Sequence, residues 1–200
     1  GASSGNGLTV AKKLGQAGAR VLLVARGVEK LEQTAEMIRK IGGEAYIYPC
    51  DLNDLKAIDA LAVQVLADHG TIDILINNAG RSIRRAVVES LDRFHDFERT
   101  MQLNYFGSIR LIMGLLPSMQ AANKGQIINI SSIGCLANAP RFAAYVASKS
   151  ALDAFSRCLS AEIHQFNINI TTIYMPLVRT PMIAPTKMYD YVPTFTPDQA

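Results

Sequence analysis

The sequence of 200 residues contains no tryptophan and only three histidines, and charged residues make up 18% of it. Basic residues exceed acidic ones by a formal charge of only +3, which gives no basic surface of the kind that nucleic acids bind. No apolar run reaches the roughly 18 residues that a membrane span needs. The hydrophobic share of 49% suits a packed core and is too high for a disordered chain. We therefore expect one domain over residues 1–200.

Patterns for disulfides and metal sites are also missing. The cysteines are odd in number and have no metal-ligand spacing, so we expect reduced thiols in the core and a reducing compartment. The histidines are scattered and are expected on the surface or at helix ends. We expect no metal site and a cytoplasmic location, with peripheral membrane association as an alternative. The residues concerned are Cys50, Cys135 and Cys158, and His69, His95 and His164.

Short apolar runs alternate with helical patterns along the chain. The runs are nearly continuous in apolar residues, which is typical of strands buried on both faces of a parallel sheet. This alternation predicts a doubly wound α/β fold with right-handed crossovers. The Gly42-Gly43 pair is expected to end the second helix. The expected strands cover residues 19–25, 44–50, 73–80, 126–132 and 168–174, and the expected helices 5–17, 28–42, 54–69, 91–121 and 143–166. Residues 176–200 hold five of the eight prolines and are expected to form a loop or lid.

The sequence opens on a glycine-rich stretch, in which Gly1, Gly5 and Gly7 precede an amphipathic helical pattern. Glycines let a backbone approach a pyrophosphate, and a helix N-terminus offers amide donors and the positive end of a dipole. The spacing is not the G-x-G-x-x-G of many dinucleotide folds, so the stretch alone is equally compatible with a flexible turn. Its place in a β-α series favours a phosphate-binding loop.

Two residues at expected strand ends bear on the choice of cofactor. Ala25 stands where many dinucleotide folds place an acidic residue for the ribose 2′-hydroxyl, and Arg26 follows it. A guanidinium can bind a 2′-phosphate bidentately, which favours NADP(H) over NAD(H), although a solvated arginine at a strand end is the alternative. Asp51 could accept a hydrogen bond from an adenine amino group or could cap the next helix.

The sequence YVASK places Tyr145 and Lys149 four residues apart, on one face of a helix. A phenol with a pKa of ~10 is a poor acid at neutral pH, and a nearby ammonium lowers that pKa. Tyr145 could then protonate a carbonyl oxygen as hydride reaches the carbon. Ser132, at the end of an expected strand, could hold the same oxygen, and Asn104 could fix a water or a helix carbonyl in a proton path.

Taken together, these motifs resemble the classical short-chain dehydrogenases/reductases over essentially the whole chain. The resemblance implies a Rossmann sheet whose first strand and C-terminal end are missing from this chain, a single catalytic domain that binds NADP(H), and a homodimer or homotetramer built on the helices at 91–121 and 143–166. It implies a catalytic tetrad of Asn104, Ser132, Tyr145 and Lys149, with Lys149 also binding ribose. The implied cofactor-binding residues are Gly1, Ser3, Ser4, Gly5, Asn6, Gly7, Arg26, Asp51, Leu52, Asn78, Ala79, Gly80, Tyr145, Lys149, Pro176, Val178 and Thr180, and the sequence NNAG, Asn77–Gly80, would stabilise the central sheet.

The chain departs from the family pattern after the last expected strand. Met175-Pro176 replaces the usual Pro-Gly, and because proline cannot copy the backbone freedom of glycine, the loop before Thr180 must differ locally. The wider sequence is most similar to short-chain reductase domains of fatty acyl-CoA reductases. An apolar groove for an acyl chain could be lined by Met175, Met182, Ile183, Met188, Tyr189 and Tyr191, and CoA phosphates could be met by Arg81, Arg84 and Arg85, although ordinary packing and solvated arginines remain alternatives.

The sequence thus predicts an NADPH-dependent reductase that transfers hydride to a long-chain acyl-CoA or a fatty aldehyde. A ketone or 3-oxoacyl reductase with the same chemistry is the first alternative. A catalytically silent regulator that binds NADP(H) is the second. A serine hydrolase is disfavoured because no histidine stands in a recognisable triad context.

Overall fold

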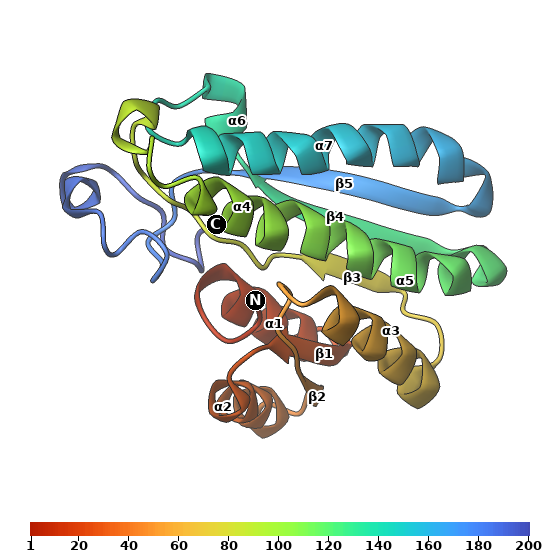
Figure 1. Cartoon of the computed structure of the whole chain (residues 1–200). Helices are drawn as coiled ribbons and strands as arrows, with labels where there is room; N and C mark the ends of the chain where they lie inside the picture. Colours follow the sequence, from red (N-terminus) through yellow and green to blue (C-terminus); the bar gives the residue numbers. More distant parts are fainter. The chain divides into compact units, whose positions relative to one another are not determined.

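The computed structural model describes residues 1–200, apart from the side chain of residue 188 (Figure 1). The chain divides into two compact units. The first comprises Gly1–Asp51 together with Pro176–Ala200, and the second comprises Leu52–Met175. None of the helices in the described part is long and apolar enough to cross a membrane.

The first unit contains two parallel strands and two helices. Helix α1 (Gly5–Gln16) leads to strand β1 (Arg20–Ala25), and helix α2 (Val28–Lys40) leads to strand β2 (Glu44–Pro49). The strands pair in register from Arg20 opposite Glu44 to Ala25 opposite Pro49. Leu23, Leu31 and Ile38 are fully buried and form the centre of this core.

The glycine pair ends α2 as the sequence predicts. Gly42 has a φ of +83°, a left-handed conformation that an L side chain rarely adopts. The amides of Gly42 and Gly43 return to the carbonyl oxygens of Arg39 and Ile38 at 3.0 Å each. These bonds satisfy two carbonyl groups that the helix end would otherwise leave open.

The segment Pro176–Ala200 is mostly irregular, as expected, with one short 3-10 turn, η4 (Lys187–Tyr191). Its two ends are tied to each other: the Arg179 amide donates to the Phe195 carbonyl at 2.8 Å, and the Phe195 amide donates to the Leu177 carbonyl at 3.0 Å. Val178, which bridges to Phe195, is buried.

The second unit is built on three parallel strands in the order β3 (Ile74–Asn77), β4 (Gly125–Ser132) and β5 (Ile168–Met175). Helices α4 (His95–Met101), α5 (Gly107–Ala122) and α7 (Ala143–Ile163) lie on one face of this sheet, and α3 (Leu55–His69) packs beside α5 (Figure 1). Shorter turns are η1 (Val87–Glu89), α6 (Gly134–Ala137) and η3 (His164–Phe166). The parallel pairing and the alternating order agree with the predicted α/β fold.

A chain of buried polar side chains joins the sheet to α7. The Asn77 amide donates to Asn129 Oδ1 at 2.8 Å, the Asn129 amide donates to Ser156 Oγ at 2.8 Å, and Ser156 donates to the Leu152 carbonyl at 2.6 Å. Every buried polar group along this chain therefore has a partner, which is the condition for burying it without a large cost. The NNAG residue Asn77 thus braces the sheet, as expected from the resemblance.

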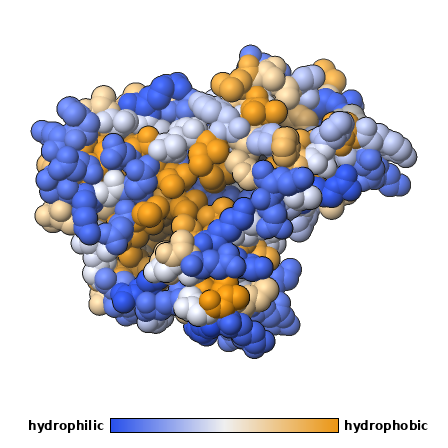
Figure 2. Space-filling model, turned by 180° about the vertical axis from the view of Figure 1, so that it is seen from behind, coloured by the Kyte–Doolittle hydropathy of each residue, from blue (hydrophilic) through white to orange (hydrophobic). Residues whose placement is uncertain are grey.

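The sheet face that α4, α5 and α7 do not cover is rich in hydrophobic residues. Figure 2, seen from the side opposite to Figure 1, shows them gathered across the middle of the surface. Among the sheet residues, Ile74 is 49% exposed and Ile173 is 39% exposed.

Three expectations need correction. The expected helix over residues 91–121 begins at His95 and is interrupted by a π-helical turn, η2 (Gln102–Phe106). The expected strand at residues 73–80 covers only Ile74–Asn77, and the chain that follows is held at Arg81 by the Asn104 side chain. Cys158 is exposed on α7 and is not part of the core.

The histidines lie where the sequence predicts: His69 ends α3, His95 begins α4 and His164 follows α7.

Candidate active site

All four residues of the predicted tetrad belong to the second unit. Ser132 is the last residue of β4, and Tyr145 and Lys149 lie in the first two turns of α7. Asn104 lies in the π-helical turn η2 between α4 and α5. Ser132 thus stands at a strand end, Asn104 at an irregular point of a helix, and Tyr145 and Lys149 near the start of a regular helix.

Asn104 is completely buried, and its amide group holds the chain that follows NNAG. Its Oδ1 accepts from the Arg81 backbone amide at 2.8 Å, and its Nδ2 donates to the Arg81 carbonyl at 2.9 Å. The same Nδ2 donates to Ser148 Oγ at 2.9 Å. The side chain thus clamps one residue of the loop from both sides and connects that loop to α7.

Ser148 was not singled out from the sequence, although it stands between Tyr145 and Lys149. Its hydroxyl accepts from Asn104 and donates to the Tyr145 carbonyl at 2.7 Å. It is fully buried. Ser148 therefore joins Asn104 to the helical turn that carries Tyr145.

Lys149 is a buried cation with a neutral hydrogen-bond partner. Its Nζ donates to the Ile130 carbonyl at 2.7 Å, and the residue is 4% exposed. Burial lowers the pKa of Lys149 from 10.5 to about 8, while the nearby Cys135 opposes this effect. At pH 7 the side chain therefore still carries its charge.

Gly80 leaves room for these groups. A Cβ at this position would lie 3.4 Å from Asn104 Oδ1 and 3.4 Å from Lys149 Nζ. A larger residue here would crowd both side chains. The proximity of these two side chains therefore explains a glycine at this position, and its backbone conformation is not needed for the explanation.

The hydroxyl of Ser132 accepts a hydrogen bond from the Gly134 amide at 3.1 Å. This bond leaves the hydroxyl proton available for an acceptor. The neighbouring Ser131 is buried and lies 3.7 Å from Cys135 Sγ.

In the first unit, the glycine-rich stretch forms the expected turn before α1. The backbone nitrogens of Gly1 and Ala2 donate to the Val24 carbonyl at 2.8 and 3.3 Å. Ser4 precedes the helix in an extended conformation and does not cap it with its side chain. Gly5 has a φ of +54°, and a Cβ there would lie 3.0 Å from the Thr180 side chain. Gly7 is buried in the first turn of α1. Ser3 lies in the turn itself.

This turn fits a phosphate-containing cofactor. The N-terminus of α1 has no capping side chain, so its amide groups are open to an anion. Asn6 Oδ1 is buried and has no hydrogen-bond partner, which is costly unless a donor such as a ribose hydroxyl meets it. Pro176, Val178 and Thr180 belong to the same unit, and Thr180 is held by the Ile183 amide, which donates to its carbonyl at 3.1 Å.

Two predicted cofactor residues, Arg26 and Asp51, follow the strands of this unit. Arg26 is exposed directly after β1. The helix that follows Asp51 is capped by Asp54, whose carboxylate accepts from the amides of Lys56 and Ala57. The alternative of Asp51 as an N-cap is therefore wrong.

Three other predicted cofactor residues belong to the second unit. The Leu52 carbonyl lies against Gly107, where a Cβ would come within 2.3 Å of it. The Asn78 amide donates to the Ile76 carbonyl at 3.1 Å, and Ala79 lies between it and Gly80 in the chain that leaves β3.

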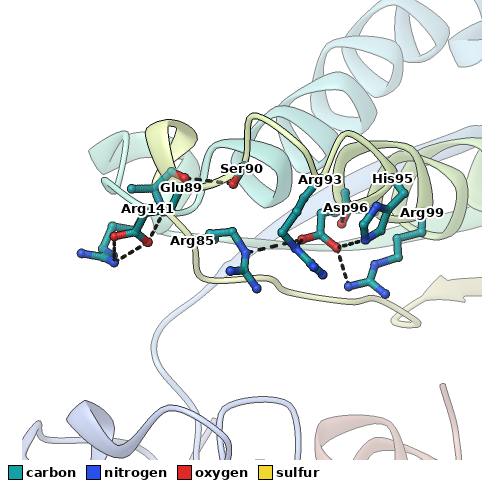
Figure 3. Close-up of polar contacts among 10 residues, drawn as sticks. Arg85, Glu89, Ser90, Arg93, His95, Asp96, Arg99 and Arg141 are labelled. Carbon is teal, nitrogen blue, oxygen red and sulfur yellow. Dashed lines mark hydrogen bonds and ion pairs between the residues drawn. The ribbon is translucent and has the colours of Figure 1, made fainter.

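Arg85, one of the arginines after NNAG, takes part in a cluster of charged side chains around Asp96. Arg85 points to Asp96, with Nε 3.6 Å from the carboxylate, and Arg93 and Arg99 contact the same carboxylate at 3.1 and 2.5 Å (Figure 3). His95 lies 3.4 Å from it. Burial alone would raise the pKa of Asp96, but Arg93, Arg99 and His95 hold it below its usual range. Arg85 therefore faces Asp96 on one side, and the contact of Arg81, Arg84 and Arg85 with CoA phosphates stays a prediction.

The residues expected to line an acyl groove have different surroundings. Met182 is 43% exposed, Tyr191 is 89% exposed and Ile183 is half-buried. Met175 ends β5, where its carbonyl accepts from the Ile133 amide at 3.0 Å. Tyr189 lies in η4. The side chain of Met188 lies outside the described residues. In the described part of the chain, no cluster of three or more His, Cys, Asp or Glu residues is placed to hold a metal ion.

Comparison with known proteins agrees with this geometry. The sequence matches the family model for short chain dehydrogenases over residues 1–189. The chain belongs to the short-chain dehydrogenase family. A fatty acyl-CoA reductase from Acinetobacter baylyi is 68% identical over 200 residues, which are 100% of this chain and 68% of that protein. The chain spans 60 to 68% of the length of its first curated relatives.

Solved structures of the family share the fold. A metagenomic short-chain oxidoreductase in complex with NADP has a TM-score of 0.83 and 37% identity, with 87% of this chain and 78% of that chain covered. An NAD⁺-bound xylitol dehydrogenase has a TM-score of 0.83 and 29% identity, with 88% and 68% covered. The chain is accordingly an oxidoreductase of the short-chain family with a Rossmann-like fold, and members with either nicotinamide cofactor are similar to it.

Proposed function

We propose that this protein is an NADPH-dependent reductase that acts on a long-chain acyl-CoA or a fatty aldehyde. The observation that carries the substrate class is the 68% identity, over the whole chain, to the fatty acyl-CoA reductase of Acinetobacter baylyi. The exposed Arg26 beside the glycine turn favours NADPH, since its guanidinium suits a 2′-phosphate. When bound, NADPH would supply the hydride that reduces the substrate carbonyl carbon.

The four tetrad residues have distinct parts in this proposal. Tyr145 donates its phenolic proton to the carbonyl oxygen, and Ser132 donates a hydrogen bond to the same oxygen. Lys149, charged at pH 7, would stabilise the phenolate that Tyr145 becomes when it gives up its proton, and would bind the nicotinamide ribose. Asn104 supports proton relay and, through Arg81 and Ser148, keeps the loop and the helix in place.

The proposed cofactor residues are those that the family resemblance implies. Gly1, Ser3, Ser4, Gly5, Asn6 and Gly7 would surround the pyrophosphate at the start of α1, and Arg26 and Asp51 would bind the adenosine end. Leu52, Asn78, Ala79 and Gly80 belong to the same proposed set. Pro176, Val178 and Thr180 lie near the nicotinamide carboxamide. A cytoplasmic location, with peripheral membrane association as the alternative, and assembly into dimers or tetramers through α4, α5 and α7 belong to the same proposal.

The test is NADPH oxidation by the full-length protein with palmitoyl-CoA, a long-chain aldehyde and a short 3-oxoacyl ester measured in parallel. NADH and the Tyr145→Phe variant serve as controls. Preference for the long chains supports the proposed substrate, and the segment 175–191 is the expected acyl site. Turnover of the oxoacyl ester alone would replace the substrate and keep the mechanism.

A silent NADP(H)-binding regulator is the second candidate, because cofactor binding by the first unit does not itself require turnover. It predicts that Tyr145→Phe keeps the function of the protein. The reductase proposal predicts loss of turnover with NADPH binding retained.

A further inference from the structure

A second set of contacts joins the chain after β3 to the start of α7, and it is centred on Arg141. The Arg85 backbone amide donates to the Arg141 carbonyl at 2.7 Å. Nη2 of Arg141 donates to both carboxylate oxygens of Glu89, at 2.8 and 2.7 Å (Figure 3). One residue thus holds two points of the segment 85–89, once through its backbone and once through its side chain.

The backbone of Arg141 is held in a conformation that its own side chain disfavours. Its φ is +70°, in the left-handed region where glycine is the usual residue. Such strain persists only when the surrounding contacts maintain it, and it concentrates at sites with a function. Because an arginine stands where glycine would fit without strain, the guanidinium is the part of the residue that the position needs.

The place of Arg141 in the chain connects it to the site. It lies four residues before Tyr145, and Phe142, the N-cap of α7, provides no side-chain capping bond. The first turn begins with the Val146 amide donating to the Phe142 carbonyl at 2.8 Å. The contacts of Arg141 therefore restrain the chain directly before this turn.

The other end of the restraint is anchored as well. Arg85, whose amide is bound by Arg141, reaches Asp96 with its side chain, and Asp96 is buried in α4. Arg81, four residues earlier, is clamped by Asn104. The loop after NNAG is thus fixed at Arg81 from one side and at 85–89 from the other, and both sets of contacts lead to α7.

We propose that Arg141 is a positioning residue for Tyr145, acting through Glu89 and Arg85 to hold the first turn of α7. The proposal rests on the reductase function above. Asn104 and Ser148 hold the side of this turn that contains the Tyr145 carbonyl, and Arg141 holds the end at which the turn begins. Loss of the Arg141 side chain loosens that end, so the phenolic hydroxyl spends less time where it can protonate the substrate.

The fold should tolerate this loss. Arg141 and Glu89 are 42% and 50% exposed, and ion pairs of this exposure contribute little to stability. Replacement by glycine also relieves the left-handed strain. A fall in turnover without a fall in melting temperature therefore separates positioning from a structural role.

The experiment compares the full-length protein with the variants Arg141→Gly, Arg141→Lys and Glu89→Gln. The matched control is Arg110→Ala, which removes an arginine of similar exposure whose partner is Asp59, also in the second unit. We expect Arg141→Gly to lower kcat about tenfold or more, since a small misplacement of a reacting group has effects of this size, with the Kd for NADPH and the melting temperature unchanged. Hydrogen exchange of the Val146 amide should become faster. Arg141→Lys should recover most of kcat, Glu89→Gln should lose part of it, and Arg110→Ala should behave as wild type.

Wild-type kcat together with unchanged exchange at Val146 in Arg141→Gly would refute the proposal. So would a lower melting temperature that accompanies weaker NADPH binding, since that result indicates a structural role only. If the wild-type protein turns over none of the substrates, the proposed function fails by itself. The exchange rate of Val146 in Arg141→Gly against Arg110→Ala then decides whether the restraint exists.

Discussion

The Nζ of Lys149 lies 2.7 Å from the carbonyl oxygen of Ile130, inside the second unit and almost out of reach of solvent. A single neutral acceptor does not replace the water that a charged ammonium loses on burial. The folded protein therefore holds the Lys149 proton less tightly than the unfolded chain does, and its pKa falls to about 8.

The stability of the protein should consequently rise with pH between about 8 and 10.5. In this range the unfolded state still binds the Lys149 proton and the folded state has released it, so higher pH favours folding, by up to about 3 kcal/mol. Urea unfolding at pH 7.5 and pH 10 measures this, with Lys149→Met as the reference. The free-energy difference between wild type and variant should change across the interval. A constant difference would contradict the prediction.

Asn104→Ala should destabilise the protein by about 2 kcal/mol and lower turnover strongly, because it removes three hydrogen bonds and leaves the Arg81 backbone groups without them. Chemical denaturation and NADPH oxidation are the measurements. Gln64→Ala removes an exposed amide that bonds only to Asp68 in the same helix, and it should change stability by less than about 0.5 kcal/mol. Equal effects of the two variants would show that the Asn104 clamp is unimportant.

Asp96→Asn should destabilise the protein by about 3 kcal/mol at pH 7, since it leaves Arg85, Arg93 and Arg99 beside one another without their common counter-charge. Because the pKa of Asp96 is lowered in the folded state, its stabilising effect is present above the unfolded pKa and is lost as pH falls below it. Unfolding experiments should therefore find the gap between wild type and variant largest at pH 7 and smaller near pH 3. A gap independent of pH would speak against the ion pairs as its cause.

Gly107→Ala should cost about 1–3 kcal/mol, because the new methyl group would come within 2.3 Å of the Leu52 carbonyl and the backbone would have to move. Gly27→Ala is the matched control, since nothing lies within 4 Å of a Cβ at that position. The melting temperatures of both variants, measured by thermal unfolding, test this prediction. Similar melting temperatures would mean that α5 can move away from Leu52 at no cost.

Arg26→Ala should raise the KM for NADPH about tenfold or more and leave the KM for NADH nearly unchanged, since the guanidinium is proposed to meet a group that only NADPH has. Arg20→Ala, at the other end of β1 and paired with Glu44, controls for loss of a surface charge. Initial rates with each cofactor provide the comparison. Parallel changes for both cofactors would place Arg26 outside the 2′-phosphate site.

The sequence was sufficient for the strands and most helices, because continuous apolar runs and helical periodicity are local properties. It did not reveal the π-helical turn at Asn104. The helical pattern continues through this turn, and the interruption depends on the Asn104 bonds to Arg81 and on the approach of Gly107 to Leu52, both remote in the chain.

In the candidate site, too, some residues could be predicted from the sequence and others could not. Tyr145, Lys149, Ser132 and Asn104 stand in a recognisable order, so they could be named in advance. Arg141 could not, because its left-handed backbone and its partner Glu89, 52 residues away, leave no local pattern. The approach of Arg85 to Asp96 could not be predicted either, because a sequence does not show that Asp96 is buried nearby.

The polar chain from Asn77 through Asn129 to Ser156 has a consequence for how the second unit assembles. A shift of β3 by one residue along β4 would turn Asn77 to the opposite face and leave the Asn129 carbonyl oxygen without its donor. An intermediate with α7 undocked would leave the Asn129 amide without Ser156. Both non-native forms would leave buried polar groups of these three side chains without hydrogen-bond partners, which raises their free energy. We therefore expect the strands and α7 to assemble cooperatively.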